Sequence, residues 1–260
     1  MSTLYVTHNA GFFSCCSVKL NMIVDYWNMT ARHPVVDSSA QFEWYKSPGE
    51  GDVTYKYFEN PVNVELSARP FAMISYHHGY QFLDYSIINY VRIMPLIQKY
   101  FTPSATIYTM IREIEEKYEL DYNNLCVLFY RGNDKVTETH LCSYREYLGP
   151  ARRVLDKNPK TKFLIQSDET EFILFMAREF PGSIVFYDEI RHMEKCVSTV
   201  DIKMKDDIEK FSMYYLAITV IMSKCRYVVC GSGNCSIWIM FYRGNCNGVY
   251  QNLTGSWLEF

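Results

Sequence analysis

The chain has 260 residues, of which 48% are hydrophobic and 21% charged, and its formal net charge is −3 at pH 7. This length fits one large domain or two smaller ones with a sizeable core. The small negative charge provides no overall attraction for nucleic acid or an anionic membrane, so we expect neither as a partner.

The sequence indicates neither export nor insertion into a membrane. Residues 1–6 lack the basic segment, apolar core and small-residue cleavage site of a secretory signal. The longest strongly apolar stretch, residues 214–222, is far shorter than the roughly 20 residues that cross a bilayer. The nine cysteines form an odd set without CxxC pairs or zinc-type Cys/His spacing. Reduced thiols in the cytoplasm are the simplest account, so we expect a cytoplasmic protein without a membrane span.

The first half of the chain mixes short apolar segments with polar loops. Thr102 and Pro103 are the expected N-cap and first-turn proline of its last helix. The polar residues 121–124 mark the expected boundary between an N-terminal lobe, residues 1–122, and a C-terminal lobe, residues 123–260. In chain order we predict a strand at 4–7, a helix at 12–26, a strand at 35–36, loops with at most one short strand at 38–69, and helices at 85–100 and 104–118.

The second half alternates regularly between strands and helices. Its strands are continuously apolar, which favours a parallel sheet covered on both faces. This pattern predicts an α/β domain of the nucleotide-binding type. In chain order the predicted elements are strand 125–130, helix 143–156, strand 162–166, helix 169–180, strand 183–186, helix 206–223, strand 226–230, helix 234–242 and strand 248–251.

Three of these predicted strands end in polar or glycine-rich turns. The first strand is followed by residues 131–135, Arg-Gly-Asn-Asp-Lys, with Glu138 shortly after; the second is followed by residues 167–169, Ser-Asp-Glu; the third is followed by residues 231–236, Gly-Ser-Gly-Asn-Cys-Ser. Solvated turns commonly follow strands, so each turn alone has a plain structural explanation. Parallel strands deliver their carboxyl ends to one edge of the sheet, where α/β proteins bind ligands. The three turns together therefore predict a binding site.

The residue types at this edge favour an anionic ligand. Arg131 can make a bidentate, permanently charged contact to a diphosphate. The turn at 231–236 precedes a helix whose free N–H groups and positive dipole end would face the same edge. Because a strand-end cation facing a cleft is not a core residue, we expect Arg131→Ala to impair ligand use and leave the fold intact. The sequence lacks both the P-loop motif and a GxGxxG turn after the first strand.

The same residues carry a family resemblance. Residues 129–135 with Glu138 resemble the HxRxxDK…E motif of the α-1,6-fucosyltransferase and protein O-fucosyltransferase superfamily, which includes the bacterial nodulation fucosyltransferase. Residues 165–169 resemble its second motif, and residues 222–236 its third. Order and spacing agree over about residues 123–251, roughly half of the chain. In the N-terminal half, Asn9 and Gly11 lie where the family has its first glycine-containing loop.

The resemblance implies a GT-B-type α/β fold with two Rossmann-like lobes and parallel sheets, the C-terminal lobe binding the nucleotide sugar. It implies an inverting glycosyltransferase that transfers fucose from GDP-fucose to a glycan or other hydroxyl acceptor, without a metal or other cofactor. By matched position, Arg131 would hold the β-phosphate, and Glu138, assisted by Lys135, would deprotonate the acceptor. The residues that would line the donor pocket are Asp168, Ser232, Gly233, Asn234 and Ser236, while Asn9 and Gly11 would lie on the acceptor side of the cleft.

The chain departs from the family pattern at three positions. The usual histidine of the first motif is Phe129, and an acidic residue found in some members is Ala217. Glu138 also lies one residue nearer to the Asp-Lys pair than in the mammalian-type enzymes. These departures keep two alternatives open: a catalytically inactive glycan- or nucleotide-binding protein of the same fold, and a transferase for another nucleotide sugar. Asp188 and Glu189, after another predicted strand, are further candidates for contact with the base or ribose.

Overall fold

The computed structural model describes residues 3–59 and 73–260. Its C-terminal half is built on a five-stranded sheet in the order β6-β5-β7-β8-β9. The first four strands run parallel, and β9 pairs antiparallel with β8. Their bounds are β5 Leu125–Tyr130, β6 Lys162–Ser167, β7 Tyr227–Gly231, β8 Val249–Leu253 and β9 Ser256–Glu259. Every residue of β5 is buried, so the prediction of a parallel sheet covered on both faces is confirmed.

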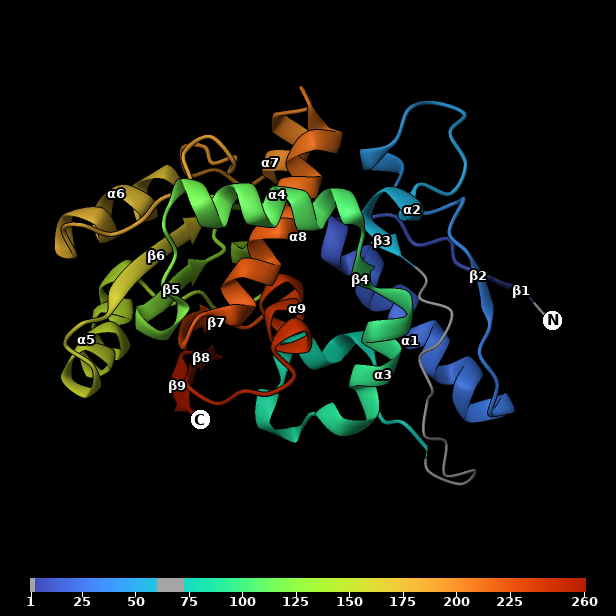
Figure 1. Cartoon of the computed structure of the whole chain (residues 1–260), viewed down its shortest axis with the longest axis horizontal. Coiled ribbons are helices and arrows are strands. Elements are labelled where there is room, and N and C mark those ends of the chain that lie inside the picture. Colours follow the sequence, from blue (N-terminus) through green and yellow to red (C-terminus); the bar gives the residue numbers. More distant parts are fainter. Residues whose placement is uncertain (1–2, 60–72) are drawn as a thin grey trace.

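Helices cover this sheet in two groups (Figure 1). Helices α5 Leu148–Lys157 and α6 Thr170–Glu179 accompany β5 and β6, and α5 continues from the 3₁₀ helix η6 Tyr144–Tyr147. Helices α8 Ile208–Lys224 and α9 Asn234–Arg243 pack on each other and face the N-terminal half. The chain runs from β5 through α5 to β6 and on through α6 to the bridge of Ile184 with Leu164, beyond β6, and then returns in the opposite direction through α8 to β7 and through α9 to β8. Right-handed connections therefore place the two groups on opposite faces.

The N-terminal half is mainly helical. Its described residues form one parallel strand pair, β1 with β2, and one antiparallel pair, β3 with β4. The long helix α1 connects β1 to β2 (Figure 1). The bounds are β1 Thr3–Tyr5, α1 Phe12–Thr30, β2 Val35–Asp37, α2 Thr54–Tyr57, β3 Phe58–Glu59, α3 Tyr90–Tyr100, β4 Thr102–Pro103 and α4 Ala105–Lys117. Short 3₁₀ helices lie at Glu43–Tyr45, His78–Phe82, Tyr85–Ile87, Tyr122–Asn124 and Asn133–Thr137, and a short α-helix, α7, at Val200–Lys203.

Several local predictions were wrong. The predicted strand at 183–186 forms only an isolated bridge between Ile184 and Leu164. The helix predicted from residue 85 starts at Tyr90, because the Asn89 side chain accepts a hydrogen bond from the Arg92 N–H and caps it there. Helix α4 is capped by Ser104 rather than Thr102, because β4 keeps residues 102–103 extended against β3. Residues 60–69, the last part of the loop region predicted at 38–69, lie outside the described residues.

The two halves share one hydrophobic core. Phe13 of α1 stacks on Trp238 of α9 with 5.9 Å between ring centroids, and the Trp238 Nε1–H donates to Ser17 Oγ at 2.9 Å. Helix α4 also packs across α8, as Figure 1 shows. The boundary at residue 122 therefore stays a prediction about sequence organisation, because side chains from both halves fill the same interior.

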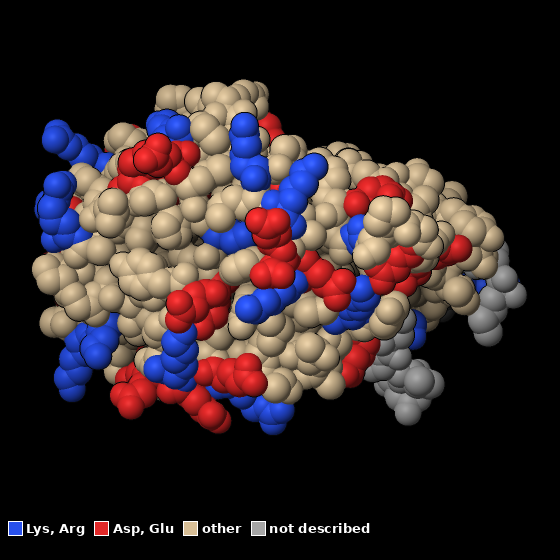
Figure 2. Space-filling view, turned by 90° about the horizontal axis from the view of Figure 1, so that it is seen from above, with Lys and Arg blue, Asp and Glu red and all other residues tan. Residues whose placement is uncertain are grey.

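The surface carries charges of both signs. On the face in Figure 2, lysine and arginine alternate with aspartate and glutamate, without a wide field of either sign. That face offers no extended cationic surface for a polyanion. Within residues 3–59 and 73–260, no helix has the length and hydropathy needed to cross a membrane. All nine cysteines are free thiols.

Candidate functional site

The site is built around Arg131, the first residue after β5. Strand β5 pairs in parallel with β6, with Tyr130 opposite Ser167, so Arg131 follows β5 at the point where Asp168 follows β6. The two side chains form an ion pair, with 3.0 Å between Arg131 Nε and Asp168 Oδ2. Arg131 Nη2 also lies 3.4 Å from Asp134 Oδ1. The carboxylates therefore hold the guanidinium at the carboxyl edge of the sheet.

The far end of the guanidinium contacts the helices on the other side of the site. Arg131 Nη1 donates to the Tyr215 hydroxyl of α8 at 3.1 Å and lies 3.6 Å from the Cys235 Sγ of α9. Burial lowers the pKa of Arg131, but Asp168 and the other neighbours raise it by more, so the group stays charged. Burial raises the pKa values of Tyr215 and Cys235, which keeps both neutral. Arg131 is thus a fixed cation among mostly satisfied partners.

A buried network fixes the backbone beside Arg131. Glu169 is fully buried, and its Oε1 accepts the Asn133 N–H at 2.6 Å while its other oxygen accepts the Tyr144 hydroxyl. Asp168 Oδ1 accepts the Gly132 N–H at 3.0 Å. A Cβ at position 132 would lie 1.9 Å from Glu169 Oε1, so only glycine fits there. The charged turn therefore has a rigid base.

Lys135 and Glu138 lie farther out on the same turn. Lys135 Nζ lies 2.7 Å from Glu138 Oε2 and 3.3 Å from Asp134 Oδ2. The Glu138 side chain is 43% exposed, whereas that of Lys135 is 16% exposed. The structure thus brings Lys135 and Glu138 together, as the predicted pairing of base and assistant requires. Their catalytic roles stay predictions.

The turn at 231–236 places the start of α9 beside Arg131. Gly233 is the N-cap, and among the described residues no side chain caps the helix. The N–H groups of Asn234, Cys235 and Ser236, in the first turn, therefore have no intrahelical acceptors. Ser236 Oγ donates to the Gly231 carbonyl at 2.6 Å, which holds the turn closed. Ser232 Oγ donates to the Asn252 carbonyl at 2.9 Å.

Arg131, Lys135 and this turn line one pocket, named here the α9 pocket. The cationic residues approach it from one side, and the uncapped start of α9 approaches from another. Such a combination suits phosphate oxygens. The predicted convergence of the first and third turns is therefore observed. The predicted donor residues on this pocket are Ser232, Gly233, Asn234 and Ser236.

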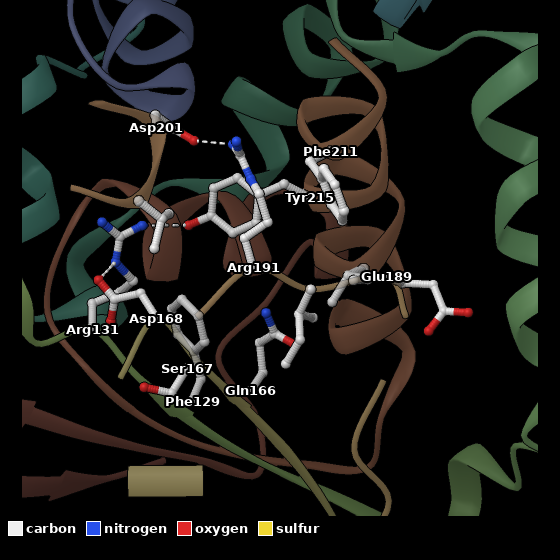
Figure 3. Close-up of a pocket in the computed structure, with 13 residues that line it drawn as sticks. Phe129, Arg131, Gln166, Ser167, Asp168, Glu189, Arg191, Asp201, Phe211 and Tyr215 are labelled. Carbon is white, nitrogen blue, oxygen red and sulfur yellow. Dashed lines mark hydrogen bonds and ion pairs between the residues drawn. The ribbon is translucent and has the colours of Figure 1, made fainter. Parts of the chain in front are cut away.

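Arg131 also lines a second pocket, named here the α8 pocket. Asp168 belongs to this pocket and not to the α9 pocket. Figure 3 shows Phe129 and Gln166 rising from β5 and β6, with Phe211 and Tyr215 of α8 across the space. Arg131 is the residue that both linings share.

The segment after α6 closes the outer side of the α8 pocket. Arg191 pairs with Asp201 at 2.5 Å, and the Tyr45 hydroxyl donates to the other Asp201 oxygen at 2.6 Å. This contact ties the segment to the N-terminal half. Glu189 pairs with Lys117 of α4 at 2.8 Å, and its carboxylate points away from the pocket in Figure 3. Glu189, which the sequence suggested for contact with the base or ribose, thus binds Lys117 of α4 instead.

The predicted acceptor-side residues lie apart from both pockets. Asn9 Nδ2 donates to the Ala40 carbonyl at 2.7 Å, and its Oδ1 accepts the Glu43 N–H at 3.0 Å. Gly11 is the N-cap of α1, with open space where a Cβ would lie. Neither residue lines the α8 or the α9 pocket, and Glu138 lines neither of them. Their proposed functions stay predictions.

Tyr215, Cys235 and Gln166 are site residues that the sequence did not single out. Tyr215 reaches Arg131 across the fold from α8, which no local pattern predicts. Cys235 and Gln166 lie within the motif-like segments 222–236 and 165–169 and could have been found as polar groups next to those turns. No group of three or more His, Cys, Asp or Glu with metal-binding geometry occurs among residues 3–59 and 73–260.

The whole fold is similar to solved structures of NodZ α-1,6-fucosyltransferase. A structure of that enzyme soaked with GDP-fucose matches with a TM-score of 0.61 at 11% identity, over 99% of this chain and 98% of that chain. A structure co-crystallised with GDP gives 0.57 at 13% identity, over 98% and 97%. A structure of NodZ from Bradyrhizobium gives 0.53 at 12% identity, over 96% and 95%.

No protein-family model and no curated protein matches the sequence. The similarity to NodZ therefore concerns the fold, and it extends over both halves of the chain rather than the C-terminal half alone. The predicted α/β fold of GT-B type, similar to that of the α-1,6-fucosyltransferases, is confirmed.

Proposed function

We propose that the chain is a glycosyltransferase that takes fucose from GDP-fucose and transfers it, with inversion and without a metal ion, to a glycan hydroxyl. The observation that carries the proposal is the α9 pocket, where Arg131 and Lys135 face the uncapped start of α9. The NodZ enzyme with this fold has been crystallised with GDP and soaked with GDP-fucose. A diphosphate is the part of that donor that the pocket's charges suit best.

The pocket can assist departure of GDP by electrostatics. As the bond between fucose and the β-phosphate breaks, negative charge grows on the phosphate oxygens. Arg131 and the N–H groups of α9 are already oriented, so they stabilise that charge without reorganisation. Removing one such preorganised donor commonly lowers the turnover rate by about 10²–10³-fold. These groups support a transfer that needs no divalent cation, and we expect EDTA to leave most activity in place.

The acceptor hydroxyl must lose its proton as it attacks. Glu138 is the proposed base, with Lys135 orienting its carboxylate through the 2.7 Å ion pair. The exposed position of Glu138 suits an acceptor that arrives from solvent. An inverting reaction requires that acceptor to approach from the face of the sugar opposite GDP. That the acceptor is a glycan is part of the proposal.

The test is a melting-temperature panel with GDP, UDP, ADP and their sugars, followed by assays for release of GDP from GDP-fucose. A ligand that binds only the native state at 100 times its Kd stabilises the protein by about 2.7 kcal/mol. We expect selective stabilisation by GDP and GDP-fucose, with turnover. Stabilisation without turnover would favour the binding protein of the same fold. Stabilisation by another nucleotide alone would favour the transferase with a different donor.

A further inference from the structure

Gln166 is a buried polar side chain without a hydrogen-bond partner among the described residues. It is 5% exposed, near the end of β6, and Oε1 makes no hydrogen bond to the part of the chain that the structure describes. An unsatisfied buried amide costs roughly 1–3 kcal/mol. Native proteins satisfy nearly all such groups, so an exception calls for an explanation. A ligand that completes the hydrogen bonds is one such explanation.

The amide faces the α8 pocket. Gln166 is the register partner of Phe129 on β5, so the two side chains stand side by side on the same face of the sheet. Figure 3 shows the amide end of Gln166 directed toward the α8 residues and the Phe129 ring next to it. Phe211 and Tyr215 lie opposite on α8. The pocket therefore places one amide beside aromatic rings, of which Phe211 already has the Arg191 guanidinium 5.2 Å from its centroid.

The other polar side chains that line this pocket are already engaged. Asp168 pairs with Arg131, and Asp201 pairs with Arg191. Glu189 pairs with Lys117 and accepts the Tyr118 hydroxyl at 2.9 Å. Ser167 Oγ accepts the Glu169 N–H, and Tyr215 donates to Cys235. Gln166 is thus the uncommitted polar side chain among the described residues of this pocket.

An amide flanked by aromatic rings suits a nucleobase. Its carbonyl accepts and its NH₂ donates, side by side, which matches the adjacent donor and acceptor on a base edge. Aromatic rings stack on the base face with little dependence on its identity. A sugar hydroxyl could pair with the amide, but it would leave the Phe129 ring beside it without a planar partner.

We propose that Gln166 recognises the base of the donor nucleotide, with Oε1 accepting N1–H of guanine and Nε2 donating to O6. This inference rests on the proposed function for the identity of the base. Arg131 lines both pockets, so in this proposal a diphosphate held against it in the α9 pocket extends its nucleoside toward the α8 pocket. Gln166 is therefore a specificity-determining residue, separate from the groups that stabilise the leaving phosphate.

The test is calorimetric titration of wild type and Gln166→Leu with GDP and with N1-methyl-GDP, which lacks the N1–H. We expect Gln166→Leu to weaken GDP binding on the order of 10- to 100-fold, as for a lost bidentate base contact. We also expect wild type to discriminate against N1-methyl-GDP and the variant to lose most of that discrimination, because the two changes remove one interaction. The melting temperature of the unliganded variant should not fall, because leucine removes an unsatisfied group. GDP affinity or discrimination equal to wild type in the variant would overturn the proposal.

The same titrations separate this inference from the proposed function. If wild type prefers UDP or ADP and Gln166→Leu weakens that nucleotide 10- to 100-fold, the GDP-fucose donor is wrong while base recognition by Gln166 holds. If GDP binds wild type and the variant equally, the donor stands and the role of Gln166 fails. If wild type binds no nucleoside diphosphate, both are overturned.

Discussion

At the scale of single residues, the surroundings of Arg131 change what its removal is expected to do. Asp168 is 4% exposed, and Arg131 is its ion-pair partner. Deleting the guanidinium would leave a buried carboxylate without its counter-charge, which commonly costs about 3–5 kcal/mol. We therefore expect Arg131→Ala to destabilise the fold, contrary to the prediction from the sequence that the fold stays intact. A substitution that keeps the charge is needed to isolate the chemistry.

Arg131→Lys is that substitution. Lysine retains the positive charge beside Asp168 but cannot make planar, bidentate contacts to phosphate. We expect turnover to fall by about 100-fold or more, with a much smaller loss of stability than in Arg131→Ala. GDP release from GDP-fucose and urea denaturation measure the two effects. Arg152→Lys, on the exposed side of α5, is the matched control and should change neither. Wild-type turnover in Arg131→Lys would remove Arg131 from the mechanism.

Glu138→Gln tests the proposed base. Glutamine keeps the shape and removes the basicity, so we expect turnover to fall by roughly 100-fold while GDP affinity barely changes. The lost pairing with Lys135 is partly exposed, so it should cost at most about 1 kcal/mol of stability. Steady-state kinetics and GDP titration provide the readouts, and Glu116→Gln on the exposed face of α4 is the control.

Normal turnover in Glu138→Gln would move the base elsewhere. Asp37 and Asp84 of the N-terminal half are the next candidates. Each currently accepts a backbone N–H in a local turn, Asp37 from Ser39 and Asp84 from Ser86, both at 2.8 Å. A base at either position would need the donor and acceptor to reach across from the C-terminal half.

At the scale of elements, the junction of β5 and β6 is the rigid part of the site. Gly132→Ala should be strongly destabilising, because its Cβ would meet the buried Glu169 carboxylate at 1.9 Å. Overpacking of this kind typically costs about 1–3 kcal/mol, and displacing Glu169 from the Asn133 N–H adds to it. Urea denaturation measures the loss. Gly51→Ala, with nothing within 4 Å of its Cβ, is the control and should change stability by less than about 1 kcal/mol. Equal stability of the two variants would contradict the packing argument.

At the scale of the whole molecule, the packing of α1 against α9 joins the two halves. Trp238 is fully buried between Phe13, Phe101 and Phe241. Two of those rings, Phe13 and Phe101, belong to the N-terminal half. A fragment of residues 123–260 would expose this surface and lose the Ser17 partner of Trp238.

We therefore expect the full chain to unfold in one transition and the fragment 123–260 to lack cooperative unfolding. Fluorescence of tryptophan and far-UV circular dichroism, followed in urea, should give coincident curves for the full chain. A fragment that unfolds cooperatively and binds GDP would show instead that the division at residue 122 separates two independent domains.

The sequence by itself determined the elements whose signals are local. The apolar run of β5 was predicted at Leu125–Tyr130 without error, because a strand buried on both faces is continuously apolar. The turns after β5, β6 and β7 were located because charged and glycine residues interrupt those runs. Parallel pairing then implied that the turns meet, and Arg131, Lys135 and the residues of 231–236 do line one pocket.

Only the tertiary structure decided which groups within those turns are free. Arg131 lies against Asp168, Glu189 turns to Lys117, and Gln166 is left without a partner among the described residues. Strand β9 likewise forms because β8 offers it an edge, although its own sequence signal is weak. Periodicity and turn chemistry act over a few neighbouring residues, whereas ion pairs, edges and cavities depend on distances between segments far apart in the chain. The sequence could therefore predict where the site lies, while packing decided which side chains remain available to a ligand.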